Sequence, residues 1–436
     1  MPDFERLTMR DIIFISLENW DGVWRRNQFL CAEWLRRFPE MRLLFVGRSK
    51  DLSHAVRSTS AAGLRRPTFQ KSAEFKGLTF LNPFKFLPNS LSPCRQFNLS
   101  LLALQIRSAA RKAGLRSPLL WINDHCAAPL AGQLNERAVV YDITDDWTLM
   151  PAVGEKERAH IRASDASLCA KADLVVVCSN ALERSRRGLC RKIITVPNGV
   201  DAAHYRPCLT ASPDQMNAPV FGYVGTLHGD RLDLDLIRDL ARAKPEAKVV
   251  LCGPDLLTVA ERKKLLAESN VQLMEQVHYA DVPRIIAGFD VCILPHRCTP
   301  FTESLNPIKL WEYLASGKPV AATPVAGFRE RAHLCHLGLG RDGFLAACSE
   351  ALREDGSRSP ARIREAESNS WKARSEQLLE AFRQMGWLGR PIPRPRRARA
   401  GGSGDGGGQK TTDSTKRSME GERVWGGQAS LCEILL

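Results

Sequence analysis

The segment 290–323, DVCILPHRCTPFTESLNPIKLWEYLASGKPVAAT, predicts a strand, a loop and a helix in succession. The apolar run at 291–294 is typical of a strand that is covered on both faces, and a polar loop follows it. Asn306 is a favoured N-cap residue, Pro307 suits the first helical position, and Gly317 is typical of the left-handed residue that follows a helix. Strand followed by helix is the repeating unit of doubly wound α/β sheets, so this segment indicates the fold class.

The first turn of this helix carries a cation, Lys309, where the helix dipole disfavours one. A cation there costs about 0.3–1 kcal/mol unless an anion is held by it and by the exposed backbone N–H groups. The helical wheel gives one polar face to Lys309, Glu312, Tyr313 and Ser316. Glu312 offers carboxylate oxygens to sugar or ribose hydroxyl groups. Two interpretations stay open: a site for a phosphate-bearing ligand, or a Lys309–Glu312 pair on the surface of an amphipathic helix.

Residues 304–320 resemble the donor-binding segment of GT-B glycosyltransferases, especially of glycosyltransferase family 4. In that family two glutamates eight positions apart bracket the loop and the helix start, and the resemblance assigns the second, here Glu312, to the ribose. The first, which contacts the donor sugar, would fall on Ser304, with Glu303 one residue early. The sugar contact is then expected either from Glu303 after a loop shift or from Ser304 as a weaker contact. The resemblance implies further donor-binding residues at Leu305, Asn306, Pro307 and Lys309.

The resemblance extends beyond this motif. YVGTLHGDRLDLDLI, residues 223–237, looks like the first strand, glycine loop and first helix of the family's donor domain, which implies donor contacts from Gly225 and Thr226. Two segments within residues 173–201, DLVVVCSNALE and ITVPNGVD, resemble the last strands of the acceptor domain. The resemblance covers roughly residues 10–387, and its more specific motifs lie in the second half.

Transfer of a sugar from a nucleotide diphosphate requires stabilisation of the leaving diphosphate. Because we predict no bound metal and no cofactor besides the nucleotide sugar as co-substrate, cations and helix N-termini must supply that stabilisation. Lys309 is the first catalytic candidate and Arg231 the second. The family usually carries an arginine directly after the loop glycine and a lysine a few residues later, whereas here Thr226 takes the first place and Arg231 approximates the other. The alternative for Arg231 is a surface charge near a helix start.

The loop after the first predicted strand, SLENWDGVWRRNQF at residues 16–29, resembles a subset of these enzymes. The resemblance implies that this loop presents Asp21, Arg25 and Asn27 to the acceptor side of a cleft. These residues are therefore predicted to contact the acceptor.

Asp145 and Asp146 follow a predicted strand, near the place where many relatives carry a histidine that touches the reacting sugar. That histidine is absent here, and the aspartates are either catalytic residues or helix caps. His125, just after the strand that ends at Ile122, is a further catalytic candidate, with a structural or surface histidine as the alternative.

Length and composition agree with two domains and a tail. The chain has 436 residues, 44% of them apolar, as in ordinary soluble globular proteins. It contains no apolar run of about 18 residues, and its start, MPDFERLTMRD, lacks the apolar segment of a secretory signal, so we expect a cytoplasmic protein. Its thirteen cysteines are scattered without a C-x-x-C pair, which favours reduced core thiols over a metal site.

The net charge of +14 attracts nucleic acid, anionic membranes and nucleotide diphosphates alike. No helix-turn-helix, RNP or zinc-finger pattern occurs, so no specific nucleic-acid partner is expected. Peripheral contact with an anionic membrane on the inner face is the preferred interpretation, because enzymes of the resembled kind often act on lipid-linked or surface-polymer acceptors. Residues 388–436 are rich in Arg, Pro and Gly, and we expect a disordered tail that either binds anionic lipid or is simply a solvated basic segment.

The expected fold is α/β: two doubly wound Rossmann-like domains of the GT-B type that face a cleft, with the disordered tail. Short apolar segments predict parallel strands at 12–17, 43–46, 119–122, 139–143 and 174–177. The predicted parts are an acceptor domain (1–206), a linker (207–219), a donor domain (220–369), a crossover helix (370–387) and the tail (388–436). Ligands in such sheets bind at the carboxyl ends of the strands, so the loops after Val224, Cys252 and Leu294 should line the donor half.

The predicted function is a retaining, metal-independent glycosyltransferase that moves a sugar from a nucleotide-activated donor to a cell-envelope glycan or lipid-linked acceptor. Two alternatives remain. One is a nucleotide-sugar epimerase of the same fold, and the other is a degenerate protein that binds a nucleotide or glycan without turnover.

Overall fold

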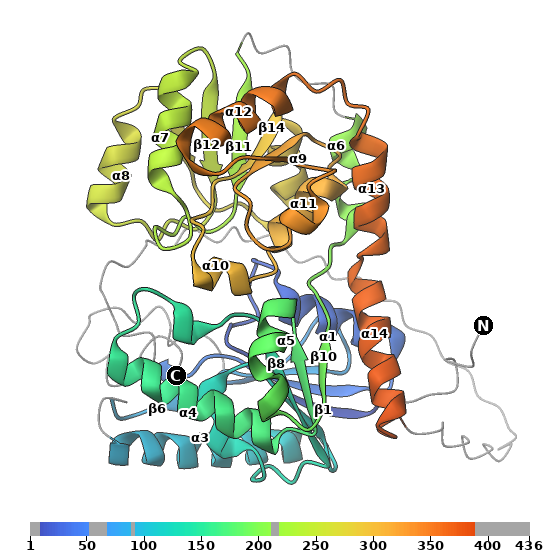
Figure 1. Cartoon of the computed structure of the whole chain (residues 1–436). Helices are drawn as coiled ribbons and strands as arrows, with labels where there is room; N and C mark the ends of the chain where they lie inside the picture. Colours follow the sequence, from blue (N-terminus) through green and yellow to red (C-terminus); the bar gives the residue numbers. More distant parts are fainter. Residues whose placement is uncertain (1–8, 52–67, 89–91, 211–217, 389–436) are drawn as a thin grey trace, which may run out of the picture.

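The computed structural model describes residues 9–51, 68–88, 92–210 and 218–388. They form two α/β domains, which lie one above the other in Figure 1. The N-terminal half of the chain builds the lower domain, and most of the second half builds the upper one. The predicted basic tail lies outside the described residues from position 389 onward.

The strands of the N-terminal domain alternate with helices along the chain. The strands are β1 (Asp11–Ile15), β2 (Arg42–Val46), β3 (Lys50–Asp51), β4 (Phe69–Lys71), β5 (Leu78–Leu81), β6 (Phe84–Lys85), β7 (Leu119–Ile122), β8 (Ala138–Ile143), β9 (Leu174–Val177) and β10 (Ile193–Thr195). The main sheet has the order β10-β9-β8-β7-β1-β2-β5-β4 and is parallel except for the β4–β5 pair, while β3 pairs with β6 apart from it. The predicted strands are thus confirmed, although β1 ends two residues earlier than expected.

Helices cover both faces of this sheet. They are α1 (Arg26–Arg37), α3 (Ser92–Lys112), α4 (Glu155–Lys171), α5 (Asn180–Arg186) and α14 (Trp371–Gln384), with shorter turns η3 (His125–Leu130), η4 (Trp147–Leu149) and η5 (Arg187–Leu189). A further turn, η6 (Ala202–Tyr205), packs against the C-terminal domain instead. Successive strand residues point to opposite faces. Phe14 packs in one core with α1 and α14, whereas Ile13 packs in a second core with α3 and α4. This two-sided burial explains why the strands are apolar throughout.

Helix α14 belongs to the end of the described chain but completes the core of the N-terminal domain (Figure 1). Its first residue, Trp371, stacks on Phe29 of α1 with ring centroids 4.9 Å apart, and Phe382 packs near Trp34 and Trp121. The helix thus lies within residues 370–387, where a helix was predicted to cross back to the N-terminal domain. Its packing there links the end of the described chain to the first domain.

The C-terminal domain repeats the same plan. Its elements are α6 (Pro207–Thr210), β11 (Val220–Val224), α7 (Leu234–Ala243), β12 (Lys248–Cys252), α8 (Val259–Leu266), β13 (Val271–Met274), η7 (Tyr279–Asp281), α9 (Val282–Ala287), β14 (Val291–Leu294), α10 (Pro300–Ser304), α11 (Ile308–Ala315), β15 (Val320–Ala322), η8 (Arg329–Arg331), β16 (His336–Leu337), α12 (Gly340–Leu352) and α13 (Ser359–Ser368). The parallel sheet has the order β13-β12-β11-β14-β15-β16, in which β11 lies between β12 and β14. The strand order reverses there, which is where doubly wound sheets bind ligands.

The boundary between the domains differs from the predicted linker at 207–219. Val200, Tyr205 and Cys208 already pack in the core of the C-terminal domain, and Cys208 Sγ donates to Pro283 O at 3.1 Å. The chain therefore joins the upper domain before position 207, because these apolar side chains find a core there. Residues 211–217 of the predicted linker lie outside the described residues.

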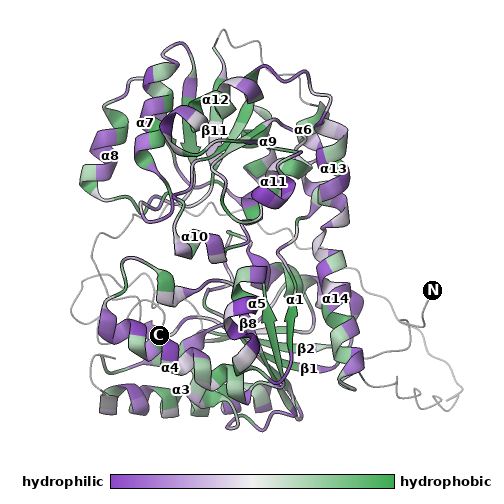
Figure 2. Cartoon of the chain, in the orientation of Figure 1, coloured by the Kyte–Doolittle hydropathy of each residue, from purple (hydrophilic) through white to green (hydrophobic). Residues whose placement is uncertain are grey.

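The strands carry mostly hydrophobic colour in Figure 2, whereas the helices that cover them carry both hydrophobic and hydrophilic colour. None of the helices in the described ranges combines the length and the apolar composition that crossing a membrane requires.

Candidate active site

A cavity of about 620 Å³ lies between the two domains, a volume that suits a small organic ligand. Loops after β1, β7 and β8 form its N-terminal wall, and loops after β11, β12 and β14 with the start of α11 form its C-terminal wall. The loops after Val224, Cys252 and Leu294 line this C-terminal wall, as predicted, while the binding of a donor there stays a prediction. Of the predicted site residues, the cavity is lined by Asp21, Arg25, Asn27, Asp145, Gly225, Thr226, Arg231, Leu305, Asn306, Pro307, Lys309 and Glu312.

Two glycines allow the loops of the C-terminal wall to touch. Gly253 has φ +148°, and a Cβ there would lie 2.1 Å from Gly225 O. Gly225 N–H in turn donates to Cys252 O at 2.9 Å. Only glycine fits at 253, and backbone rather than side chains therefore forms this part of the wall.

Lys309 and Glu312 do contact each other, but inside the cavity rather than on an outer surface. Lys309 Nζ lies 2.5 Å from Glu312 Oε2, and their side chains are 26% and 4% exposed. The Lys309–Glu312 pair of the second interpretation is therefore present, but its predicted position on the surface of the helix is wrong. A nearly buried carboxylate beside a half-buried cation leaves the cation's remaining N–H groups for a ligand.

The start of this helix differs from the prediction by one residue. Pro307 is the N-cap, and Asn306 lies before it. Asn306 Oδ1 instead accepts hydrogen bonds from Asn198 N at 2.9 Å and from Trp311 Nε1 at 3.2 Å. The predicted end is confirmed, because Gly317 follows the helix with φ +69°.

The predicted polar face of α11 is only partly free. Tyr313 is fully buried, and its hydroxyl accepts from Val224 N at 3.0 Å. Ser316 is also buried and donates to Tyr313 O at 2.7 Å. Since β11 packs against this side of the helix, only Lys309 and Glu312 of the four residues line the cavity.

Neither Glu303 nor Ser304 lines the cavity, so the predicted sugar contact from either side chain is not offered by this structure. Glu303 forms an ion pair with Arg329, and 35% of its side chain is exposed. Ser304 is 3% exposed and its Oγ donates to Phe301 O at 2.7 Å. Ser179 Oγ of the other domain donates to Ser304 O at 2.6 Å. Ser304 therefore joins the domains, and α10 lies between them in Figure 1.

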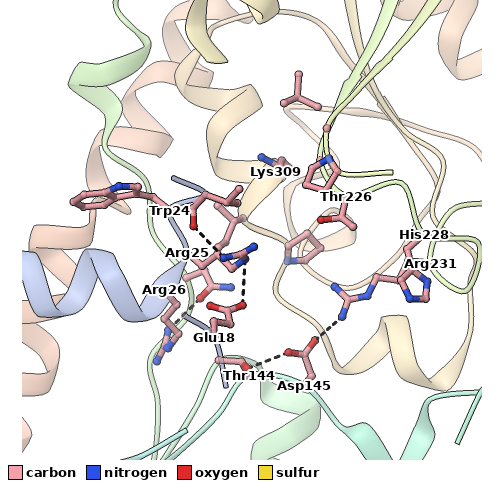
Figure 3. Close-up of a pocket in the computed structure, with 18 of the residues that line it drawn as sticks. Glu18, Trp24, Arg25, Arg26, Thr144, Asp145, Thr226, His228, Arg231 and Lys309 are labelled. Carbon is pink, nitrogen blue, oxygen red and sulfur yellow. Dashed lines mark hydrogen bonds and ion pairs between the residues drawn. The ribbon is translucent and has the colours of Figure 1, made fainter. Parts of the chain in front are cut away.

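Arg231 reaches across the cleft toward Asp145. Its Nη2 lies 3.5 Å from Asp145 Oδ1 (Figure 3), and its guanidinium lies over the ring of Phe301, 5.2 Å from the centroid. Among the described residues, Arg231 Nε is buried without a hydrogen-bond partner. The predicted cation thus lines the cavity, rather than pointing outward as a surface charge.

Asp146 and His125 lie outside the cavity, which does not support the predicted catalytic contacts. Asp146 is buried in an ion pair with Arg186, and it caps η4 by accepting from Thr148 N at 3.1 Å, as the helix-cap alternative predicted. His125 is buried behind the N-terminal wall, where burial and the charge of His160 lower its pKa to about 4. Both follow strands whose carboxyl ends face the cleft, but their side chains turn into the protein.

Asp124, His125 and Cys126 offer metal-ligand atoms within 4.8 Å of one another. Asp124 already accepts from Cys126 N at 2.9 Å, and the positive charge of Arg48 acts on its carboxyl group. A second cation next to Arg48 is electrostatically disfavoured, so the surroundings of this cluster fit a metal ion poorly.

On the N-terminal wall, Arg25 contacts two carboxylates. Its Nε lies 3.2 Å from Glu18 Oε1, and its Nη1 lies 3.3 Å from Asp21 Oδ1. Asp21 Oδ1 also accepts from Val23 N at 2.9 Å. Two of the predicted acceptor residues are therefore engaged with each other, and they shape the wall as one hydrogen-bonded group.

Arg26 connects this wall to the other domain. Its Nε and Nη2 donate to both oxygens of buried Asp142 at 3.0 and 3.1 Å, and its Nη1 donates to Val196 O at 2.9 Å and to Asn198 Oδ1 at 3.2 Å. Asn198 Nδ2 then donates to Asn306 O at 2.6 Å. A continuous polar network therefore runs from α1 to Asn306, the residue before the N-cap of α11.

The sequence did not single out Glu18 or His296, which also line the cavity. Burial raises the pKa of Glu18 to about 7, against the opposing effect of Arg25. Burial and the charge of Arg231 lower the pKa of His296 to about 3, so its imidazole is neutral. Among the described residues, His296 Nδ1 has no hydrogen-bond partner. Both residues follow a strand closely, Glu18 after β1 and His296 after β14, at the carboxyl ends of the two sheets. That position could have marked them in the sequence as residues of the site.

Glu18→Gln is expected to change how thermal stability depends on pH. Because the folded-state pKa of about 7 exceeds the ordinary 4.5, the native protein binds this proton more tightly, and wild-type stability falls as pH rises from 4.5 through 7. Glutamine mimics the protonated form, so the variant should melt higher than wild type at pH 8 and equally at pH 4. Melting curves across this range check it, with exposed Glu155→Gln as control. Parallel curves for wild type and Glu18→Gln would contradict the burial argument.

Residues 218–355 match the family model described as glycosyl transferases, group 1. The match spans most of the C-terminal domain, including the glycine loop, Lys309 and Glu312. The two-domain fold with a cavity between the domains is of the GT-B type, and the C-terminal domain is similar to group 1 glycosyl transferases.

Individual relatives agree with that class. The putative teichuronic acid biosynthesis glycosyltransferase TuaH of Bacillus subtilis (strain 168) is 26% identical over 264 residues, which are 56% of this chain and 66% of TuaH. The chain therefore spans just under two thirds of this curated relative.

Solved structures show the same fold. Sucrose-phosphate synthase from Thermosynechococcus elongatus superposes with a TM-score of 0.65 at 17% identity, covering 86% of this chain and 99% of that one. Anabaena HepE in complex with UDP and glucose gives a TM-score of 0.59, also at 17% identity, and covers 86% and 99% of the two chains. At these identities the likeness establishes the fold alone.

Proposed function

We propose that this protein transfers a sugar from a nucleotide diphosphate donor to a cell-envelope glycan or glycolipid acceptor, with retention at the sugar carbon and without a bound metal. The observation that carries the proposal is the Lys309–Glu312 pair, which faces a cavity between two domains at the start of a donor-type helix. The relation to a teichuronic acid enzyme supports an envelope acceptor.

The C-terminal wall suits a nucleotide diphosphate. Lys309, Arg231 and the N-terminal end of α11 direct positive charge into one cavity, which favours a diphosphate. Glu312 offers carboxylate oxygens to ribose hydroxyl groups. The HepE complex with UDP and glucose supports a nucleotide sugar as donor.

Transfer is favoured over the two alternatives. TuaH, sucrose-phosphate synthase and the group 1 family model are all named for sugar transfer or synthesis, and none for epimerisation. A protein that only binds would hydrolyse no donor and transfer no sugar, so one assay with and without acceptor separates it from an enzyme. Formation of a second nucleotide sugar without acceptor would indicate the epimerase. The cytoplasmic location and the peripheral membrane contact stay predictions.

Glu312→Gln is expected to weaken nucleotide-sugar binding about 10- to 100-fold, because a hydrogen bond to a charged group contributes about 1.5–3 kcal/mol. Calorimetry first screens common nucleotide sugars on the wild type and then compares the variant with the ligand that binds. Glu376→Gln, on an exposed position of α14, is the matched control. Unchanged affinity in a folded Glu312 variant would remove the ribose assignment.

A further inference from the structure

Arg48 lines the cavity from the N-terminal wall, two residues after β2. Among the described residues, its guanidinium has no hydrogen-bond or ion-pair partner. The other arginines of this wall are neutralised: Arg25 contacts two carboxylates, and Arg26 is paired with Asp142. Asp124 and Glu18 stabilise the positive charge of Arg48 from a distance, but neither carboxylate contacts its guanidinium, which therefore has its donors available on the cavity side.

The backbone that carries Arg48 is held firmly. Arg48 N donates to Asn19 Oδ1 at 3.0 Å, and Gly47 N donates to Leu81 O at 2.9 Å. A Cβ on Gly47 would lie 2.8 Å from Asn19 Oδ1, so the close approach depends on glycine. Burial lowers the pKa of Arg48, which means that its charged form loses hydration here. An anionic ligand would offset that loss.

Asn27 provides a second, independent observation on the same wall. It is 2% exposed, and its Oδ1 has no hydrogen-bond partner among the described residues. The orientation of its amide follows from its neighbours. Asn123 Nδ2 donates to Asp142 O at 2.9 Å, so Asn123 Oδ1 must accept from Asn27 Nδ2, at 2.8 Å. Asn27 Nδ2 also donates to Ser16 Oγ at 2.8 Å, which leaves Oδ1 as the atom without a partner.

The loop after β1 joins the two features. Ser16 binds Asn27, and Asn19 binds the backbone of Arg48. We infer that Arg48 and Asn27 form a subsite for a sugar or polyol acceptor that carries a phosphate or carboxylate near a free hydroxyl group. The planar guanidinium can bind either anion through two parallel hydrogen bonds, and Asn27 Oδ1 can accept a hydrogen bond from the hydroxyl group.

This subsite is separate from the proposed donor contacts, since Lys309 and Arg231 belong to the C-terminal wall. The inference rests on the proposed sugar transfer and adds the class of acceptor to it. An uncharged sugar could still donate a hydroxyl hydrogen bond to Asn27 Oδ1, but it would offer the guanidinium of Arg48 no anion to contact.

Binding of glucose, glucose 6-phosphate and glucuronate to the full-length protein tests the inference, because the three share one ring and differ in charge. We expect at least one of the anionic sugars to bind about tenfold or more tightly than glucose. Arg48→Gln should abolish that preference, and Arg48→Lys should keep part of it. UDP affinity should stay unchanged in both variants. Arg111→Gln, exposed on α3 of the same domain, is the control and should behave as wild type.

The preferred anion identifies the acceptor group as phosphate or carboxylate. Equal affinities for the three sugars, or no measurable binding of either anionic sugar, would overturn the inference. So would a preference that persists in Arg48→Gln. Failure of the wild type to bind any nucleotide or nucleotide sugar would count against the proposed function instead, which keeps the two outcomes distinguishable.

Discussion

Lys309→Gln is expected to lower the rate of sugar transfer by about 100-fold or more. Removing one group that stabilises developing charge in a preorganised site typically has an effect of this size. Lys309 Nζ faces the cavity beside Arg231 and the N-terminal end of α11, where the leaving diphosphate is proposed to lie. A single-turnover assay of sugar transfer measures the loss directly.

Stability should fall in the same variant. The sequence alone suggests that losing a cation from a first helical turn relieves the helix dipole, but the structure pairs Lys309 with Glu312, a side chain that is only 4% exposed. Lys309→Gln leaves that carboxylate without its cation, so the melting temperature should decrease. The double variant Lys309→Gln, Glu312→Gln removes both charges and should regain stability while staying slow.

Exposed Lys263→Gln on α8 is the control and should change neither quantity. Full activity in a destabilised Lys309→Gln protein would mean that the pair is only structural, and the diphosphate assignment would then be wrong.

Arg26→Met is expected to destabilise the protein by about 3–5 kcal/mol, because it leaves buried Asp142 without its partner. The same guanidinium also donates to Val196 O and Asn198 Oδ1, so the turn that contacts Asn306 loses support. Urea unfolding followed by circular dichroism measures the change.

A double variant and a control variant separate the effect of the unpaired charge from that of the lost side chain. Arg26→Met with Asp142→Asn removes the unpaired charge and should recover part of the loss. Arg36→Met breaks an exposed pair with Glu33 on the same helix and should cost under about 1 kcal/mol. If Arg26→Met costs no more than Arg36→Met, the buried network does not hold the two domains as described.

The sequence predicted the parts of the fold that depend on local pattern. Apolar runs such as 119–122 and 174–177 became buried parallel strands, because a strand covered on both faces has to be apolar throughout. Gly317 ended its helix as expected, since its φ of +69° favours glycine. The loops that line the C-terminal wall of the cavity were also predictable, because ligands of parallel α/β sheets bind at the carboxyl ends of the strands.

Features that depend on a distant partner were not predictable from spacing. Asn306 has the residue type of an N-cap, but it bonds instead to Asn198, which is 108 positions away. Ser304 matches a sugar-binding position, yet a hydrogen bond from Ser179 holds its carbonyl in the domain contact. Tyr313 lies on the polar side of the wheel and is nevertheless buried, because β11 offers its hydroxyl a donor. In each case tertiary contacts outweigh the local pattern.

Helix α10 has a mechanical consequence. It is part of the C-terminal domain by sequence, yet Phe301 and Leu305 share an apolar cluster with Met150, Val153 and Ile161 of the N-terminal domain. A hinge motion that widens the cleft must therefore either pull these side chains out of the cluster or let α10 travel with the lower domain. In the second case, the segment between β14 and α11 would bend at each opening, and entry of a substrate would be coupled to the shape of the wall that receives it.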